Sequence, residues 1–267
     1  MATKIEWADE VWNPVTGCTP VSEGCAHCYA KRMASRLRGR YGYPADEPFR
    51  VTVHDDRMAQ PISWRKHRRV FVCSMGDLFH QDVDAQTLGF VFAMMSLCRR
   101  HTFMVLTKRP GRMHEMINGR YLRIETEIIH RVNVLRHGLD APSEMEGWPL
   151  PNVWLGVTAE NQTRADERIR VLLETPAARR FVSVEPMLGA VDLLDYMRGY
   201  GRFYSSTALD WVICGAETGP GARPMNLDWA RDLRDQCVAA RVPFFFKRDS
   251  DGNRELDGRM WEQYPTG

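Results

Sequence analysis

Residues 152–186 read NVWLGVTAENQTRADERIRVLLETPAARRFVSVEP and contain a complete strand–helix–strand unit. Residues 152–158 and 180–186 are short, continuous apolar runs, which are typical of parallel strands covered on both faces. Residues 161–175 between them follow a helical pattern and begin with Asn161, a residue suited to capping a helix N-terminus. This unit predicts an α/β fold built on parallel strands.

The same pattern recurs along the rest of the chain. Further strands are predicted at 49–55, 70–75, 102–108, 210–217 and 242–248, and around Ile5–Trp7 or slightly later, which makes eight. Helices are predicted at 84–100 and 226–240. Repeated strand–helix units with right-handed crossovers favour a TIM-like (β/α) barrel, full or partial. A flavodoxin-like open sheet is the alternative arrangement.

The predicted barrel takes up residues 1–248 and contains one interval that is too long for a simple connection. Residues 111–151 are predicted to be an insertion, with an Arg- and His-rich amphipathic helix followed by a Pro- and Gly-rich loop. We interpret it either as a lid over the substrate or as a longer crossover. Residues 249–267 contain the hairpin signal Asp257-Gly258 and predict a small C-terminal flap.

The composition is that of a soluble globular protein and argues against a membrane or secreted protein. Hydrophobic residues make up 44% of the 267 residues and charged residues 26%, which is ordinary for a soluble globular protein. No run reaches the ~18 apolar residues of a membrane helix, and no apolar secretory segment stands near the N-terminus. We therefore expect a cytoplasmic protein with no membrane partner. The seven cysteines are then expected to be thiols or metal ligands.

The charge is unevenly distributed between the two halves of the chain. Residues 1–120 carry 18 Lys and Arg against 12 Asp and Glu, whereas residues 121–267 carry 18 against 22. A basic first half suits a polyanionic partner such as a nucleic acid. However, only five of the 36 cationic residues are Lys, and such an excess of Arg can equally reflect genomic base composition.

Ionisable residues follow nearly every predicted strand, at the edge where a parallel barrel builds its active site. A rim of carboxylates and cations suits a polar ligand that carries both charges, and an ordinary polar strand end is the alternative. The segment 214–226 adds glycines and a helix start, which suit a phosphate or carboxylate group, or serve only as a turn. The candidates are Ser74, Asp77, Lys108, Glu185, Gly215, Glu217 and Arg223, with Glu185, Glu217 and Lys108 as the predicted catalytic residues.

Cys18, Cys25 and Cys28 form a C-x6-C-x2-C loop. A structural zinc site needs four N or S ligands, commonly from two CxxC-type pairs, and the second pair is missing here. His27 lies between Cys25 and Cys28 in the sequence. It could complete a Cys3His set only if its side chain turned toward the ion that these cysteines bind. Three thiolates suit a [4Fe-4S] cluster with one iron left open to a small molecule. A structural zinc, a cluster closed by a fourth cysteine and three unconnected thiols stay open as alternatives.

This loop, followed by a helix predicted at Tyr29–Arg38, resembles the cluster loop of radical S-adenosylmethionine (SAM) enzymes, which share a full or partial α/β barrel. Their usual pattern is C-x3-C-x-aromatic-C, so this chain departs from it in the first gap and at His27. Motifs along nearly the whole chain, including KIEWADEVWNPVTGC, VFVCSMGDLFHQDV and DWVICGAETGPGARPM, also resemble a phage-associated three-cysteine family. Members of that family are commonly described only as phage proteins of unknown function.

The resemblance implies that Cys18, Cys25 and Cys28 bind a [4Fe-4S] cluster and that SAM chelates its open iron. One electron from an external donor would then cleave SAM to a 5′-deoxyadenosyl radical, which abstracts hydrogen from the substrate. It also suggests that His27 packs against the adenine of SAM.

The remaining cofactor contacts are assigned by position. Ser74 and Asp77 are the nearest matches to the residues that meet the amino group of SAM. Gly215 and Glu217 lie in VICGAE, which is loosely similar to a segment near the adenine, and Arg223 is added from the Gly-rich turn.

The predicted substrate is a nucleobase, a nucleotide or a modified DNA base, because of the basic first half and the phage resemblance. Rearrangement or hydrogen abstraction would be the reaction, in the cytoplasm of a bacterial host cell if a phage encodes the protein. The alternative from another class is a zinc-bearing nucleic-acid-binding protein without catalysis.

Overall fold

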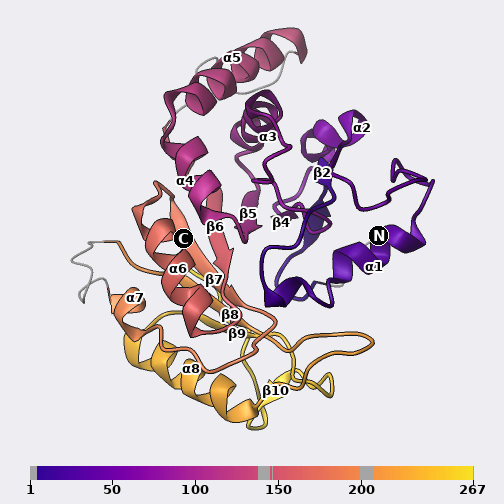
Figure 1. Cartoon of the computed structure of the whole chain (residues 1–267). Helices are drawn as coiled ribbons and strands as arrows, with labels where there is room; N and C mark the ends of the chain where they lie inside the picture. The colour runs from indigo at the N-terminus through magenta and orange to yellow at the C-terminus, as the bar shows by residue number, and fades with distance from the viewer. Residues whose placement is uncertain (1–4, 138–144, 146, 199–206, 267) are drawn as a thin grey trace. The chain divides into compact units, whose positions relative to one another are not determined.

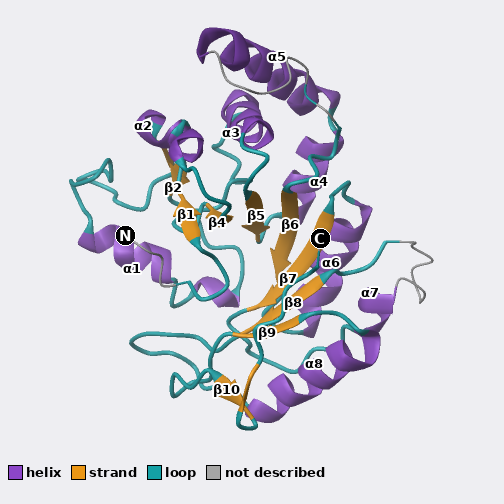
Figure 2. Ribbon diagram, turned by 180° about the vertical axis from the view of Figure 1, so that it is seen from behind, coloured by secondary structure: helices purple, strands orange, loops and turns teal. Residues whose placement is uncertain are grey.

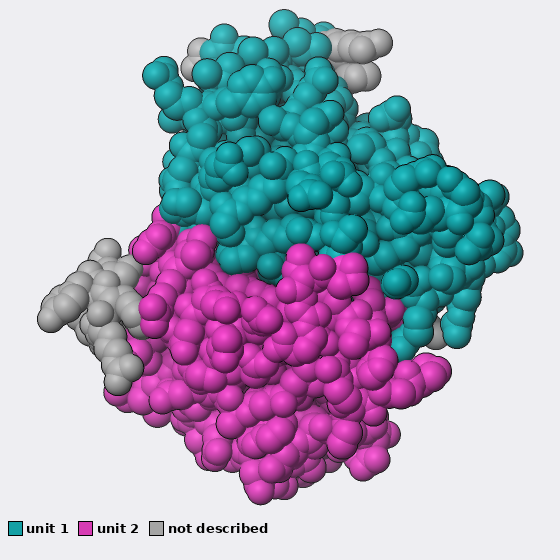
Figure 3. Space-filling model, viewed as in Figure 1, with its two compact units in different colours: residues 1–19, 30–155, 175–178 teal, residues 20–29, 156–174, 179–267 magenta. Residues whose placement is uncertain are grey.

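The computed structural model describes residues 5–137, 145, 147–198 and 207–266. The chain divides into two compact units, which are coloured separately in Figure 3. Unit 1 comprises Met1–Thr19, Ala30–Leu155 and Thr175–Ala178, and unit 2 comprises Pro20–Tyr29, Gly156–Glu174 and Arg179–Gly267. One boundary between the units, at Thr19 and Pro20, lies between Cys18 and Cys25. Another, at Leu155 and Gly156, lies inside a strand of the main sheet.

Seven strands follow the order β1-β4-β5-β6-β7-β8-β9. Their bounds are β1 Glu10–Trp12, β4 Arg69–Val72, β5 Thr102–Thr107, β6 Val153–Thr158, β7 Arg179–Val184, β8 Trp211–Cys214 and β9 Phe244–Phe246. The neighbours β1 and β4, β4 and β5, β7 and β8, and β8 and β9 pair in parallel. Each new strand joins beside the previous one, as in a (β/α) barrel, and the described residues contain no pairing of β1 with β9. The predicted α/β, TIM-like fold is confirmed in its partial-barrel form.

The helices of unit 1 follow its strands (Figures 1 and 2). They are α1 Tyr29–Arg36, whose first residue belongs to unit 2, α2 Asp55–Met58, the 3-10 helix Gln60–Ser63, α3 Ala85–Leu97, α4 Pro110–Asn118 and α5 Arg120–His137. Helix α3 is apolar on nearly all sides and buries most of its residues. Helix α5 lies against it, so that the core of this unit continues beyond the sheet.

In unit 2, helix α6 spans Gln162–Glu174, α7 Leu194–Arg198 and α8 Leu227–Ala240. Helices α6 and α8 begin where the sequence predicts them, whereas the short helix α7 was not predicted. The Asn161 side chain accepts a hydrogen bond from the Arg164 N–H at 3.0 Å, and the Asn226 side chain accepts one from the Asp228 N–H at 2.9 Å. The predicted cap at Asn161 is confirmed, and Asn226 caps α8 in the same way, because each side chain satisfies an amide that the first helical turn leaves free.

The C-terminal tail forms the predicted hairpin. Strands β10 Glu255–Leu256 and β11 Arg259–Met260 pair antiparallel. The two turn residues, Asp257 and Gly258, have φ angles of 55° and 71°, as a two-residue type I′ turn requires. That the tail acts as a separate flap stays a prediction.

The strand predicted at 49–55 is wrong. Only Thr52–Val53 are extended, as β3, and they pair antiparallel with β2, Val15–Thr16, outside the main sheet. Helix α2 begins already at Asp55. Val53 is 39% exposed, so the run lacks the two-sided burial of a central parallel strand. The first strand of the sheet is β1, slightly later than Ile5–Trp7.

The long interval 111–151 contains most of α4 and all of α5, followed by residues that partly lie outside the described chain. The predicted Arg- and His-rich helix is therefore confirmed as α5. Its role as a lid stays a prediction. No described helix is both long enough and apolar enough to cross a bilayer.

Candidate functional site

The cysteines fall into two groups by exposure. Cys18, Cys25 and Cys28 are partly exposed, and the other four, Cys73, Cys98, Cys214 and Cys237, are buried. Burial raises the pKa of Cys73 and of Cys98 to about 12, and it raises the pKa of Cys214 and of Cys237 further. A buried protonated thiol is a poor metal ligand, because the thiolate is the form that binds. This difference favours the three loop cysteines as ligands and disfavours a fourth.

Cys18 belongs to unit 1, where backbone hydrogen bonds hold it and its neighbour Gly17. The Gly17 N–H donates to the Met75 carbonyl at 2.9 Å, and the Cys18 N–H donates to the Phe49 carbonyl at 3.2 Å. Gly17 has a φ of +87°, and a Cβ added to it would lie 2.2 Å from the carbonyl oxygen of Arg50. Only glycine fits there, since a side chain would meet backbone that cannot move aside.

A guanidinium lies beside Cys18. The Arg109 Nη2 is 3.9 Å from the Cys18 sulfur and donates to the Thr19 carbonyl and hydroxyl oxygens at 3.0 and 2.8 Å. The Thr19 hydroxyl also lies 2.9 Å from Nε2 of the buried His80. A fixed cation next to a cysteine favours its thiolate form, which is the form that ligates iron.

In unit 2, side chains at the strand ends hold the segment Pro20–Tyr29, here called the cysteine segment. The Ser22 hydroxyl donates to Glu160 Oε1 at 2.5 Å, and Arg168 donates to Glu160 Oε2 at 2.9 Å. Glu160 is fully buried and Arg168 is 4% exposed. A Cβ at Gly24 would lie 2.3 Å from Glu160 Oε1, so the backbone of the segment comes close to this buried ion pair. Glu160 thus fixes the segment rather than pointing into open space.

Glu23 makes a second attachment of the cysteine segment. Arg164 donates to Glu23 Oε2 at 3.2 and 3.1 Å, and the Asn161 amide donates to Glu23 Oε1 at 2.5 Å. The pKa of Glu23 is lowered to about 2, first by its own backbone N–H and then by Arg164 and Asn161. The 3-10 helix Glu23–Cys25 begins at this attachment.

A third attachment joins His27 to the end of β8. Glu217 Oε2 is 2.8 Å from His27 Nδ1 and accepts from the Arg223 N–H and Nε at 2.8 and 2.9 Å. Arg223 also donates to the Glu23 carbonyl oxygen at 3.0 Å. Mainly because of Arg223, and with help from His27, the pKa of Glu217 is lowered to about 2. The carboxylate is therefore ionised at neutral pH and holds His27 between Cys25 and Cys28.

A fourth group lies at the ends of β7, β8 and β9. The Lys247 ammonium donates to Glu185 Oε1, and both side chains are less than one-fifth exposed. A Cβ at Gly215 would lie 3.2 Å from the Lys247 Cβ and 3.5 Å from the Glu185 Cδ. Gly215 thus leaves room for the ion pair. The pair is a candidate for proton transfer, because an acid and a base are hydrogen-bonded at the carboxyl ends of the strands, where parallel barrels build their active sites.

In unit 1, the predicted residues Ser74, Asp77 and Lys108 have local partners. Buried Asp77 accepts from the Thr107 hydroxyl at 2.7 Å and from the Lys108 backbone N–H at 3.2 Å. The Ser74 hydroxyl donates to Asn13 at 3.3 Å. Asp77 thus fixes the end of β5, and its predicted contact with SAM, like that of Ser74, stays a prediction, as does the catalytic role of Lys108.

Within unit 2 the structure brings together His27, Glu217 and Arg223, and it places Gly215 beside Glu185. The sequence pattern did not predict a role for Arg168, and it named Glu160 only as one of the ionisable residues that follow the predicted strands. The signal for Arg168 was available, since it lies in the apolar stripe of α6 with Ala165, Ile169 and Leu172. A charged residue at such a position needs a buried partner.

The donor set fits an iron–sulfur cluster in its chemistry. Cys18, Cys25 and Cys28 are thiols reachable from solvent, one with a guanidinium beside it, and thiolates are the normal ligands of cluster iron. In the described part of the chain, no three His, Cys, Asp or Glu side chains converge to hold a single ion. His27 Nδ1 is hydrogen-bonded to Glu217, as in many metal-ligating histidines, so this contact does not by itself exclude the Cys3His zinc set.

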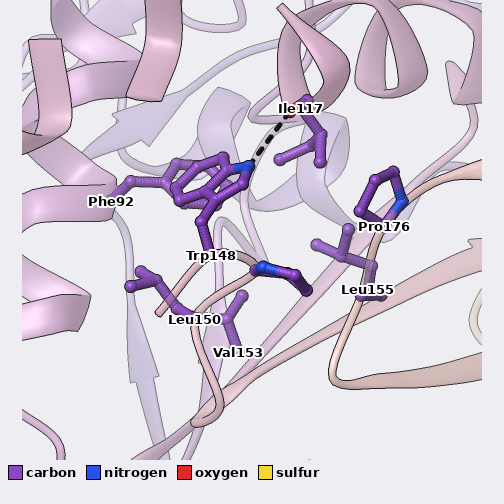
Figure 4. Close-up of a pocket in the computed structure, with 9 residues that line it drawn as sticks. Phe92, Ile117, Trp148, Leu150, Val153, Leu155 and Pro176 are labelled. Carbon is purple, nitrogen blue, oxygen red and sulfur yellow. Dashed lines mark hydrogen bonds between the residues drawn. The ribbon is translucent and has the colours of Figure 1, made fainter. Parts of the chain in front are cut away.

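Unit 1 also contains an apolar pocket (Figure 4). Its volume is about 10 Å³, far below the ~300–1,000 Å³ of typical ligand pockets. The rings of Phe92 and Trp148 lie 5.8 Å apart at its edge, and Trp148 Nε1 donates to the Ile117 carbonyl oxygen at 3.2 Å. The pocket holds no charged side chain, so we assign it no part in the site.

Two solved structures of spore photoproduct lyase, a radical SAM enzyme, are similar to this chain. A single mutant has 12% sequence identity and a TM-score of 0.50, over 90% of this chain and 75% of that one. A double mutant with bound AdoMet and dinucleoside spore photoproduct has 11% identity and a TM-score of 0.49, over 91% of this chain. This chain spans 64% of the length of that second structure.

The first of these likenesses shows a shared fold, while membership of the phage-associated family stays a prediction. No curated protein matches the sequence. The family model described as "Protein of unknown function (DUF5131)" matches residues 2–265, and the chain therefore belongs to this family.

Proposed function

We propose that this protein is a radical SAM enzyme in which Cys18, Cys25 and Cys28 hold a [4Fe-4S] cluster. The observation that carries the proposal is the division of the cysteines: three accessible thiols in one loop, against four buried thiols with raised pKa values. The partial-barrel fold, which spore photoproduct lyase shares, supports the same function.

Held by Cys18, Cys25 and Cys28 and reduced by an external donor, the cluster would supply the electron for reductive cleavage of SAM and so for hydrogen abstraction from the substrate. The residues of this chain prepare the site for that chemistry. Arg109 favours the thiolate of Cys18, while Glu160, Glu217 and their partners fix the cysteine segment.

Glu185 and Lys247 are proposed to bind or move a proton at the substrate. They share one hydrogen bond at the ends of β7 and β9 and are largely shielded from solvent. A proton can pass along such a bond when a substrate group replaces one partner. The substrate class is proposed to be a nucleobase, a nucleotide or a modified DNA base, on the basic character of residues 1–120.

The test is anaerobic reconstitution with iron and sulfide, followed by dithionite and SAM. We expect a brown protein with about four irons and the release of 5′-deoxyadenosine. Cys18→Ala, Cys25→Ala and Cys28→Ala should each lose the cluster, whereas the control Cys98→Ala, at a buried cysteine, should retain it. A colourless protein with one zinc would instead support the non-catalytic nucleic-acid-binding alternative.

The proposed substrate class needs its own measurement. Binding of DNA or nucleotides should weaken steeply as salt is raised, because released counterions drive such binding. No binding at low salt would contradict this substrate class and leave the cluster chemistry standing.

A further inference from the structure

Helix α5 is fixed to unit 1 through one of its faces. Leu122 and His130 are buried, and His130 Nδ1 lies 2.7 Å from the Ser96 hydroxyl of α3. A Cβ added to Gly89 of α3 would lie 2.8 Å from the Cβ of Glu125, which shows how closely the helices approach. Figures 1 and 2 both show α5 beside α3. One face of α5 is therefore fixed against α3, and the position of the opposite face is fixed with it.

The opposite face carries a row of exposed apolar side chains, here called the α5 stripe. Of the eleven large apolar side chains that are exposed among the described residues, five belong to this one helix. They are Tyr121 (57% exposed), Ile124 (47%), Ile128 (52%), Val132 (50%) and Leu135 (81%). At 3.6 residues per turn, all five lie within about 40° of Ile128 around the helix, over a length of ~21 Å. This concentration marks an interaction surface rather than scattered surface residues.

The spacing of the α5 stripe is symmetric about Ile128. Tyr121 and Leu135 each stand seven residues from it, and Ile124 and Val132 each stand four residues from it. If two copies of α5 lie antiparallel around a two-fold axis at Ile128, Tyr121 of one copy is level with Leu135 of the other. Ile124 is likewise level with Val132, and Ile128 with itself. In an isologous interface residue i contacts j and j contacts i, and this spacing places apolar side chains opposite apolar side chains along the whole stripe.

Charges beside the α5 stripe are also compatible with a second copy. Glu127 and Arg131 lie on one edge of it and form an ion pair at 2.8 Å. Their side chains are 38% and 50% exposed. In the antiparallel arrangement, Arg131 stands about two residues along the axis from Glu127 of the other copy, on the same edge. Opposite charges thus meet across the interface.

We propose that this protein associates with a second copy of itself through antiparallel packing of the α5 stripe. The contact is one helix width by ~21 Å, smaller than the ~800 Å² that each partner buries in a standard interface. The dimer is therefore weak. The inference is independent of the proposed chemistry, because it uses no residue of the cysteine loop or of the strand ends.

Sedimentation equilibrium of the full chain from about 10 to 500 µM tests the proposal. The wild-type weight-average mass should rise toward that of a dimer. Ile128→Arg should remain monomeric, because two cations would meet at the axis. The matched control is Val238→Arg on α8, where the wild-type side chain is 56% exposed, and it should dimerise like the wild type. Circular dichroism checks that both variants are folded.

A charge exchange gives a second readout that does not depend on the apolar residues. Arg131→Glu should weaken dimerisation about three- to tenfold, and the double variant Glu127→Arg/Arg131→Glu should restore it. A wild type that stays monomeric over the whole range would overturn the proposal. So would an equal effect of Ile128→Arg and Val238→Arg, or a failure of the double variant to restore the mass.

Discussion

Replacing Arg168 by methionine tests the buried attachment of the cysteine segment. The side chain keeps its approximate length but loses its charge and its hydrogen bonds to Glu160 Oε2 and the Thr158 carbonyl oxygen. Glu160 is then a fully buried carboxylate that has lost its cationic partner, while the Ser22 hydroxyl still donates to it. Breaking a buried ion pair by removing one partner is destabilising by about 3–5 kcal/mol.

A second substitution at Glu160 is expected to restore part of the lost stability. In Glu160→Gln/Arg168→Met the residue at 160 is neutral and can still accept from Ser22. The double variant should therefore be more stable than Arg168→Met by about 1–3 kcal/mol, because no unpaired charge is buried. Arg164→Met is the matched control on the same helix. Arg164 pairs with a Glu23 side chain that is 37% exposed, and an exposed pair contributes only ~0–1 kcal/mol.

Thermal unfolding followed by circular dichroism is a suitable assay. A loss of 3–5 kcal/mol lowers the midpoint by on the order of 10 °C in a chain of this size. Iron content after reconstitution should also fall in Arg168→Met, since Ser22 loses its fixed acceptor. If Arg168→Met and Arg164→Met unfold at the same temperature, or if adding Glu160→Gln lowers stability further, Glu160 does not carry a buried charge and the reasoning fails.

Three further predictions concern the same loop. Glu217 has a folded-state pKa of about 2, below its ordinary 4.5, so its ion pairs stabilise the protein above pH ~4.5 and are lost as the pH falls toward 2. The stability advantage of wild type over Glu217→Gln in urea titrations should thus shrink between pH 6 and pH 3, and a constant advantage would contradict the pairing. Gly17→Ala should be far less stable than Gly252→Ala. Both glycines have a φ near +90°, but only at Gly17 would an added Cβ meet backbone atoms within 4 Å. Equal melting temperatures would exclude the steric explanation. Arg109→Met should slow alkylation of Cys18 at neutral pH by about three- to tenfold while Cys25 and Cys28 react as before, and an unchanged rate would show that the guanidinium does not stabilise the thiolate.

The sequence was informative wherever local pattern and burial agree. The apolar runs of β4 to β9 are strands because both of their faces are covered, and Asn161 and Asn226 cap helices because the cap is a local interaction. The prediction of a central strand at 49–55 failed because β-branched residues are favoured in a short exposed strand as well as in a buried one. Hydrophobicity alone does not separate these two environments.

At the candidate site, position along the chain predicted which residues stand at strand ends but not what they contact. Glu217 follows β8 as expected, yet its partner His27 is 190 residues away. Arg168 reaches Glu160 from the next helix, and Lys247 reaches Glu185 across β8. Such pairings depend on the order of strands in the sheet, which no single segment of sequence contains.

The way in which the cysteine segment is held has a consequence for the length of its loop. Between Cys18 and Cys25 the backbone takes part in no strand pairing, and the attachments to Glu160, Arg164 and Glu217 all come from side chains. Extra residues can therefore be inserted there without shifting the register of any sheet. Lengthening a three-residue gap to six costs only about 0.6 kcal/mol of closure entropy, so the unusual spacing of the first two thiols is a change that this scaffold tolerates easily.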